Sequence, residues 1–233
     1  MKKVLVLSLL IGILILSACA PQATPMSSPV DTTKVPLATV VPKIETAASP
    51  QWTAYTNATF GLSFQYPSEW FGPDEYVVEQ TLRLQIGSDV VYPYGTDRTE
   101  QIYTVPNSYA ITIQYSQNDQ VAVWGDTYNS LLSLQDGESL SDARDKLIRI
   151  GTVSIGVFDG IEYIATLSDT AQTEPVYARQ VVLFDENSNA LTIMGSPNNV
   201  MLADNADWRD AYRLIDEANQ DVFHAVVESM TIK

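Results

Sequence analysis

Cysteine and histidine are almost absent from this 233-residue chain, which has one of each, Cys19 and His224. A lone cysteine excludes an internal disulfide, so a packed core must supply the stability of any folded domain. Transition-metal sites built on His and Cys need several such side chains, so these sites and most zinc chemistry are nearly excluded. Cys–His catalysis would need Cys19 itself, which is expected to carry lipid, and is nearly excluded too. No nucleophile or orienting carboxylate is identifiable for His224, which we interpret as a plain surface or boundary histidine. We accordingly assign no catalytic residue, no metal and no cofactor.

Basic residues are also scarce, since 13 Lys and Arg face 28 Asp and Glu, a formal net charge of −15. Nucleic acids and anionic lipid surfaces attract proteins through basic patches. The composition therefore argues against nucleic acid as a partner. The sequence also lacks Gly-x-Gly-x-x-Gly, Walker-type and Gly-x-Ser-x-Gly motifs, so the common nucleotide and esterase signatures are missing.

No apolar run reaches the roughly 20 residues of a membrane-spanning helix. The longest apolar run, Val4–Leu16, carries no charge, follows two lysines and has the size of a signal-peptide core. Leu16-Ser17-Ala18-Cys19 follows directly and resembles the bacterial lipobox, in which the cysteine thiol receives a diacylglyceryl group. We therefore predict cleavage before Cys19 and lipid (palmitate) attachment to it. An ordinary signal cut after Ala18 or Ala20, or an uncleaved anchor, remains an alternative.

This N-terminus predicts an extracytoplasmic protein held on the outer face of the cell membrane by its lipid. Residues 20–50 contain six of the twelve prolines, many Ala, Thr and Ser, and neither glycine nor an aromatic residue. Such a segment cannot bury enough apolar surface to offset the entropy of ordering. We therefore divide the chain into a signal peptide (1–18), a lipidated cysteine with a disordered linker (19–50) and one globular domain (51–233).

Alternating apolar residues predict an antiparallel sheet in the globular domain. The alternation runs over 60–66, where Pro67 ends it, and again over 82–86 and 109–115. It also flanks Asp159-Gly160, a dipeptide that favours a hairpin turn between strands at 153–157 and 161–165. Two further strands, Val176–Phe184 and Leu191–Met194, flank the polar loop 185–189.

Helical spacing of apolar residues predicts helices in three places. The first, over residues 140–148, follows Ser139 as a candidate N-cap. The others cover Trp208–Ile215 and Val222–Val227, and Thr231–Lys233 is expected to close the fold as a short strand.

The segment Tyr55–Trp70, which ends in Tyr-Pro-Ser-Glu-Trp, resembles the opening of PsbP-like domains, which share the Mog1/PsbP fold. The closing segment Phe223–Ile232 is similar to the final helix and short strand of that family, whereas Phe71–Gln220 departs from the pattern. The resemblance implies an α+β fold, an antiparallel sheet flanked by helices. It also implies a non-enzymatic role in binding a partner or stabilising an assembly.

Two groups of residues are candidates for binding sites. Asp185-x-Asn187-x-Asn189 has the spacing of a calcium loop, but Ala190 and Ser196 stand where the EF-hand pattern needs glycine and glutamate, so we interpret it as a hairpin loop. Asp207 and Asp210 are interpreted as acids at a helix N-terminus. Trp70 and Trp208 are expected in the core. Trp124 and Tyr94, in expected loops, are candidate ligand-binding residues.

The sequence leaves three functional hypotheses. The first is a lipid-anchored, non-enzymatic binding or accessory module for an unknown protein or small molecule. The second is an extracytoplasmic hydrolase that uses a pair of carboxylates, and the third is a calcium-dependent adhesion or stability module.

Overall fold

The computed structural model describes residues 51–89, 106–117, 121–142, 145–168 and 176–233, with the backbone alone at 121–124, 141–142 and 145. The chain divides into two units, Met1–Thr46 and Ala47–Lys233, and every described residue belongs to the second. The predicted signal peptide, Cys19, the linker and Tyr94 lie outside the described residues. In the described ranges, no helix combines the length and the hydrophobicity that a membrane crossing requires.

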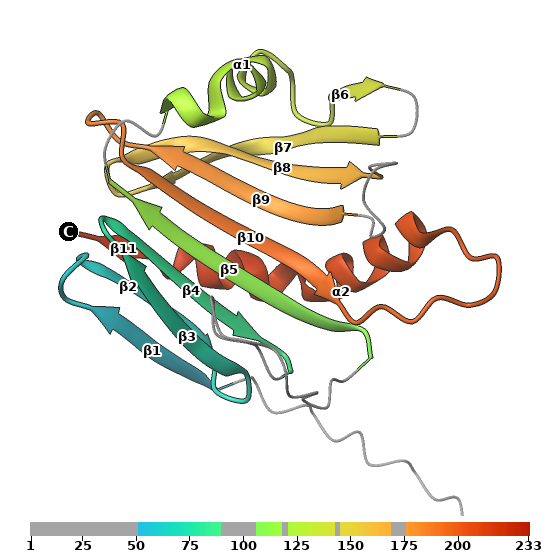
Figure 1. The fold of residues 1–233 in the computed structure, drawn as a ribbon, viewed down its shortest axis with the longest axis horizontal. Coiled ribbons are helices and arrows are strands. Elements are labelled where there is room, and N and C mark those ends of the chain that lie inside the picture. Colours follow the sequence, from blue (N-terminus) through green and yellow to red (C-terminus); the bar gives the residue numbers. More distant parts are fainter. Residues whose placement is uncertain (1–50, 90–105, 118–120, 143–144, 169–175) are drawn as a thin grey trace, which may run out of the picture. The chain divides into compact units, whose positions relative to one another are not determined.

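Antiparallel strands form two sheets (Figure 1). The smaller sheet has the order β1 (Trp52–Asn57), β2 (Leu62–Pro67), β11 (Thr231–Ile232). The larger has the order β3 (Phe71–Val78), β4 (Thr81–Gly87), β5 (Ser108–Ser116), β10 (Ala190–Asn198), β9 (Val176–Phe184), β8 (Phe158–Leu167), β7 (Asp145–Ile155), β6 (Ser139–Asp142). With the helices α1 (Val121–Leu132) and α2 (Trp208–Glu228), they make the α+β class that the sequence predicts.

The long helix α2 covers one face of the large sheet, and the small sheet packs on the same side near β3–β5 (Figure 1). The buried apolar side chains of α2, Phe223, Val226 and Val227, have the spacing of one helix face and pack against the inward-facing residues of both sheets. The shorter helix α1 contributes Leu131 to a second, smaller core on the opposite face of the large sheet. On β9, Val181 and Leu183 therefore belong to the main core, whereas Val182 between them belongs to the smaller one.

Most of the predicted strands are confirmed. β2, β4, β5, β9 and β10 contain the alternating segments, and β2 ends at Pro67, which has no N–H to continue a ladder. The two predicted C-terminal helical segments belong to one helix, α2, which is followed by β11 as expected. Asp207 is its N-cap, accepting from the Arg209 backbone N–H at 3.0 Å, and Asp210 lies in its first turn.

The helix predicted over residues 140–148 is wrong. Ser139–Asp142 is strand β6 and Asp145–Ile155 is strand β7. The two strands pair, with Leu140 directly opposite Leu147. Both leucines pack on the smaller core. A hairpin places residues seven apart on the same face here, which is also the spacing of two helical turns, so the pattern does not distinguish the two structures.

The hairpin turn predicted at Asp159-Gly160 is also wrong. The turn lies three residues earlier, at Gly156-Val157, and Ile155 pairs with Phe158. Gly156 adopts a positive φ of 61°, which a turn of this kind requires. Gly160 instead lies inside β8, where a Cβ atom would come within 1.9 Å of the Val182 carbonyl oxygen. The glycine at position 160 therefore allows β8 and β9 to approach each other closely and does not form a turn.

Candidate functional site

The apolar layer beneath α2 gives way to charged residues towards the helix's N-terminal half. Glu162 on β8, Arg179 on β9 and Asp216 on α2 are all buried there. Together with Tyr109 on β5 and His224 on α2 they form a connected group, here called the buried charge cluster. Ionised side chains are rarely buried unless they are paired, so each buried charge here needs a partner of opposite charge.

Strand register places the first two members of the cluster. Arg179 lies opposite Ile164, and Glu162 lies opposite Val181, so the two charged residues are diagonal neighbours on the same face of the sheet. The Arg179 Nη1 donates to Glu162 Oε1 at 2.5 Å. This face is the one covered by α2, which delivers Asp216 to the other side of the guanidinium.

Two residues, Arg179 and Tyr109, donate hydrogen bonds to the carboxylate of Asp216. The Arg179 Nε donates to both carboxylate oxygens at 3.2 Å, and Nη2 donates to Oδ2 at 2.7 Å. The Tyr109 hydroxyl donates to Oδ1 at 2.9 Å. Burial and the negative charge of Asp216 raise the pKa of Tyr109 well above its usual value, so this hydroxyl stays protonated. Burial alone would lower the pKa of Arg179, but its bonds to Asp216 and Glu162 raise it.

Glu162 and His224 form the outer part of the cluster. The His224 Nε2 lies 3.0 Å and 3.1 Å from the two oxygens of Glu162. Burial would raise the pKa of Glu162, but hydrogen bonds from His224 and Arg179 outweigh it, so the pKa is lowered and the carboxylate is ionised. The same bond to Glu162 raises the pKa of His224. His224 is thus a boundary residue, about one third exposed, that caps a buried carboxylate.

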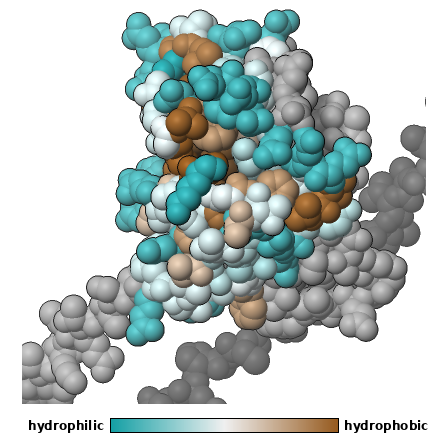
Figure 2. Space-filling model, turned by 90° about the vertical axis from the view of Figure 1, so that its left-hand side faces the viewer, coloured by the Kyte–Doolittle hydropathy of each residue, from teal (hydrophilic) through white to brown (hydrophobic). Residues whose placement is uncertain are grey.

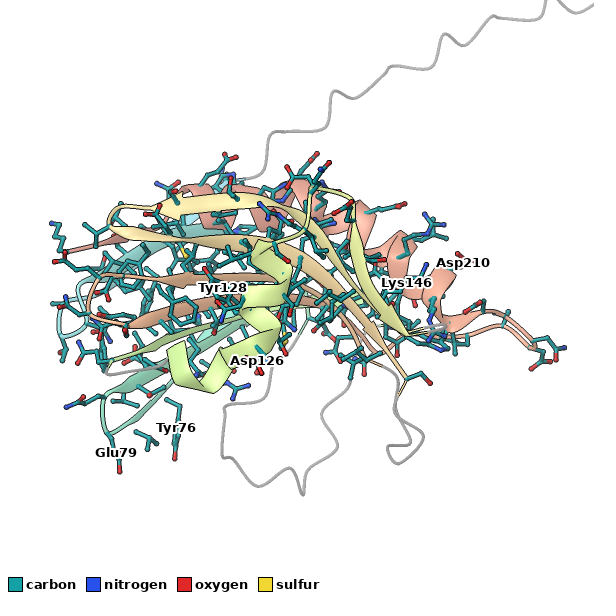
Figure 3. All side chains as sticks on the ribbon, turned by 90° about the horizontal axis from the view of Figure 1, so that it is seen from above. Tyr76, Glu79, Asp126, Tyr128, Lys146 and Asp210 are labelled. Carbon is teal, nitrogen blue, oxygen red and sulfur yellow. The ribbon has the colours of Figure 1, made fainter. Side chains whose placement is uncertain are left out.

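A cavity of about 490 Å³ opens beside the cluster, between α2 and the ends of β7, β8 and β9. We call it the α2 cavity; it is lined by Lys146, Ile148, Ile164, Thr166, Tyr177, Arg179, Asp207, Arg209, Asp210, Arg213, Asp216 and Glu217. Arg179 and Asp216 connect it to the buried charge cluster. Figure 3 shows Lys146 on β7 and Asp210 at the start of α2, both at the same end of the molecule.

Positive charge is concentrated at this cavity. The described part of the chain contains seven Lys and Arg residues, and four of them line it. Arg213 is engaged with Glu217 at 2.7 Å and Asp210 at 3.6 Å on the exposed side of α2. The Arg209 guanidinium lies 4.3 Å from the centre of the Trp208 ring. In a strongly acidic protein, such a local balance of charge marks the cavity as a distinct electrostatic environment.

The opposite end of the molecule offers a different surface. Figure 2 faces that end and shows hydrophobic side chains in a broken strip bordered by hydrophilic ones. Val157 in the β7–β8 turn is 71% exposed, and Leu132 at the end of α1 is also exposed. Apolar residues scattered among polar ones are normal on protein surfaces and carry no chemistry of their own.

The aromatic residues singled out in the sequence are dispersed. Trp70 packs at the edge of the main core, as expected, and Trp208 is half-buried with its ring edge-on to Tyr212. Trp124 belongs to α1, just before a break in the helix at Gly125, rather than to a loop; its side chain lies outside the described atoms. The cluster and the α2 cavity were not among the predicted sites.

The polar loop between β9 and β10 is a hydrogen-bonded hairpin loop. Asp185 Oδ1 accepts from the backbone N–H groups of Asn187 at 2.9 Å and Asn189 at 2.8 Å, and Oδ2 accepts from the Asn189 side chain. The carboxylate is thus engaged within its own loop. Among the described residues, no group of three or more His, Cys, Asp and Glu side chains is arranged to hold a metal ion.

A signal for the cluster is present in the sequence. Glu162 and Arg179 occupy core-facing positions in strands that carry no other charged residue on that face. Asp216 lies four residues after Tyr212 and seven before Phe223, on the apolar stripe of α2. A charged residue at a core-facing position needs a partner, so these three interruptions together could have indicated a buried ionic cluster.

The arrangement is chemically suited to holding a ligand. The two buried carboxylates share one guanidinium, so neither has the apolar, unpaired setting that turns a carboxyl into a general acid at neutral pH. The guanidinium is fixed on two sides and faces a cavity of small-molecule size. No protein-family model and no curated protein matches the chain.

Proposed function

We propose that this protein is a lipid-anchored, extracytoplasmic binding module with a PsbP-like domain, which binds a small organic molecule in the α2 cavity without transforming it. The observation that carries the proposal is the Arg179 guanidinium, fixed by Asp216 and Glu162 at the wall of a cavity of about 490 Å³. Ligand pockets in proteins have volumes of about 300–1,000 Å³ and a few fixed polar groups among apolar ones. The α2 cavity has both properties.

The N-terminal sequence supports the anchor. Leu16-Ser17-Ala18-Cys19 supplies the acceptor cysteine, and the two or three acyl chains of a lipoprotein hold it stably, whereas a single chain holds it only marginally. Residues 20–50 would then reach roughly 30 Å as a random coil and roughly 95 Å fully extended. Such a linker holds a binding domain clear of the lipid surface.

The arrangement of the domain supports the PsbP-like assignment. The hairpin β1–β2, which ends at Pro67 with Trp70 closing the core edge, opens the domain, and α2 followed by β11 closes it. These are the two segments on which the resemblance rests. The antiparallel sheet between them, with a helix on each face, agrees with what that family implies.

The charge state of the cluster supports binding rather than hydrolysis. A glycosidase-type acid needs a carboxyl whose pKa is raised, and the pKa of Glu162 is lowered instead. His224 pairs through Nε2 with that same carboxylate, which raises the pKa of the imidazole and so favours the protonated form, a form that cannot accept a proton as a general base.

Metabolic labelling with a palmitate analogue tests the anchor. We expect label on the wild-type protein and none on Cys19→Ala, which should accumulate as uncleaved precursor or appear in the medium. A Cys19→Ala protein that is still cleaved and membrane-bound would contradict the assignment.

Native mass spectrometry of the protein purified from its own membrane tests the binding role. We expect a bound small molecule on the wild type and none on Ile164→Trp, because the larger ring fills the cavity. Val157→Trp, at an exposed turn outside the cavity lining, is the matched control and should retain the molecule. A wild-type spectrum of the empty polypeptide alone, from fresh membranes, would count against a binding module.

A further inference from the structure

We infer that the α2 cavity is selective for organic monocarboxylates with a compact apolar body, the carboxylate lying against Arg179 and Lys146. The inference rests on the proposed binding function and adds the chemical class of the ligand. It follows from three features of the cavity: hydrogen-bond donors without partners, apolar walls, and the sign of the charge on each side.

The first feature is the set of unused donors on Arg179. A guanidinium has five N–H bonds. In the described part of the chain, three are engaged: Nε and one on Nη2 with Asp216, and one on Nη1 with Glu162. One N–H therefore remains on each terminal nitrogen, and each can donate a charge-assisted hydrogen bond to a carboxylate oxygen. Because the side chain is only 4% exposed and lines the cavity, the acceptor must come from within the cavity.

Two more donors line the same cavity. Neither the Lys146 ammonium nor the Tyr177 hydroxyl makes a hydrogen bond or an ion pair with any residue in the described ranges. Burial and the charge of Asp216 raise the pKa of Tyr177 to about 12, so its hydroxyl remains protonated and able to donate. The β7 and β9 sides of the cavity thus offer donors and no acidic side chain, and an acceptor-only head group matches them.

The second feature is the apolar part of the lining, to which Ile148 and Ile164 contribute between the polar groups. A ligand that places only a polar head in the cavity would leave these side chains against water. Burying an apolar body against them is favourable in proportion to the area removed from water. The ligand therefore needs a hydrocarbon portion, of a size that fits about 490 Å³.

The third feature limits the ligand to one negative charge. The α2 side of the cavity carries Asp207, Asp210 and Glu217, and with Asp216 the four acidic residues of the lining equal the four basic ones. A second carboxylate on the ligand would extend away from Arg179 towards acidic side chains and be repelled. An ammonium head would meet the guanidinium and Lys146. Monocarboxylates avoid both conflicts.

Four probes with the same six-carbon chain separate these possibilities: hexanoate, hexan-1-ol, hexylammonium and adipate. Their affinities for the full lipidated protein in detergent are measured by titration calorimetry, and Ile164→Trp provides the correction for partition into detergent. We expect hexanoate to bind at least about tenfold more tightly than the other three, the loss of charged hydrogen bonds being of that order.

Two variants test the contacts without disturbing the buried cluster. Lys146→Met removes an exposed ammonium and should weaken hexanoate about tenfold, and Tyr177→Phe should weaken it several-fold by removing one donor. Lys233→Met, at the C-terminus and outside the cavity lining, is the matched control and should leave the affinity unchanged.

Adipate or hexylammonium binding as tightly as hexanoate, or hexanoate affinity that is insensitive to both variants, would overturn the inference. The proposed function fails differently. A molecule seen on the wild type in native spectra, which hexanoate cannot displace, refutes the carboxylate class and leaves the binding module intact. A protein that carries no molecule and binds none of the probes refutes both.

Discussion

Replacing Arg179 with methionine is the sharpest test of the buried charge cluster, because this one side chain forms ion pairs with both buried carboxylates. Its side chain is 4% exposed, and those of Asp216 and Glu162 are 0% and 7% exposed. Methionine has a similar length and no charge. The substitution therefore leaves two buried carboxylates without their shared cation and changes the packing little.

Removing one partner of a buried ion pair destabilises a protein by about 3–5 kcal/mol, mainly because the remaining charge is uncompensated. For a domain of this size, each kcal/mol lowers the melting temperature by about 2–4 °C. We therefore expect Arg179→Met to unfold roughly 6–20 °C below the wild type at pH 7. Urea titration followed by tryptophan fluorescence gives the free energy of unfolding, and thermal melting gives the temperature.

Arg213→Met is the matched control. Arg213 also contacts two carboxylates, Asp210 and Glu217, but all three side chains are largely exposed. Exposed ion pairs contribute little to stability and are screened by salt. This variant should unfold at the wild-type temperature within the error of the measurement, so any difference between the two arginines reports burial.

The effect should also depend on pH, with a defined sign. In the wild type the pKa of Glu162 is lowered, so its stabilising contribution is present above about pH 4.3 and is lost as the pH falls through the folded-state value. Without Arg179 that benefit shrinks, and the buried carboxyl prefers to be protonated. The difference in the free energy of unfolding between the wild type and Arg179→Met should therefore become smaller as the pH falls from 7 to 4.

A further variant distinguishes lost charge balance from lost packing. Arg179→Met combined with Asp216→Leu and Glu162→Leu removes every buried charge of the cluster and should regain most of the lost stability. An Arg179→Met protein that loses less than about 1 kcal/mol, well below the buried-pair range, would refute the account of the cluster. So would a triple variant that is no more stable than the single one.

Three other measurements test separate parts of the structure. As His224 is the only histidine, the NMR signal of its Hε1 proton is assigned without ambiguity and should report a pKa above about 6.5 that returns towards 6.5 in Glu162→Gln. The associated stability is present below about pH 6.5 and lost as the pH rises through the folded-state value. Gly160→Ala should destabilise by about 1–3 kcal/mol in urea titrations, because its Cβ would meet a strand carbonyl oxygen at 1.9 Å. Gly151→Ala should be tolerated, because the nearest atom to its Cβ would be an Asp136 carboxylate oxygen at 4.0 Å, an ordinary contact distance. Asp185→Ala should cost about 1–2 kcal/mol through lost loop hydrogen bonds, and millimolar calcium should leave the wild-type melting temperature unchanged.

The strands were predictable from the sequence where one face of the strand is buried and the other face is exposed to solvent. In β2, Leu62, Phe64 and Tyr66 are buried while Ser63 and Gln65 are not, and this difference produces the period of two in the sequence. The long helix was predictable for the same reason, since its buried stripe faces a single core. Both predictions use local sequence only, because the partner on the buried side need not be known.

The strands β1, β3 and β6 and the helix α1 were not predicted, for a different reason. Four of the eight residues of β3 are consecutive and exposed, Glu75–Val78, so no burial alternates along them. In α1 the helix is broken at Gly125, where φ is 42°, and the break disrupts any regular period. These elements depend on long-range partners, which local patterns do not encode.

The candidate site shows the limit of local patterns most clearly. Glu162, Arg179 and Asp216 are far apart in the sequence, and each alone is one charged residue at a core-facing position. Only the β8–β9 register and the placement of α2 bring them within hydrogen-bonding distance. Charged residues at core-facing positions can be found in a sequence, but only the structure shows which of them pair with one another.

The stability of the domain does not explain why the cluster exists. A buried ionic network is often no more stabilising than well-packed apolar residues of the same volume, because desolvation offsets the attraction between charges. The adjacent core of Phe223, Val226 and Val227 shows that α2 can pack with apolar side chains alone. What the cluster adds is a guanidinium held in one orientation at a cavity wall, with two N–H bonds left unused. A ligand that accepts those bonds gives this otherwise costly arrangement a physical reason, and the reason lies in binding rather than in folding.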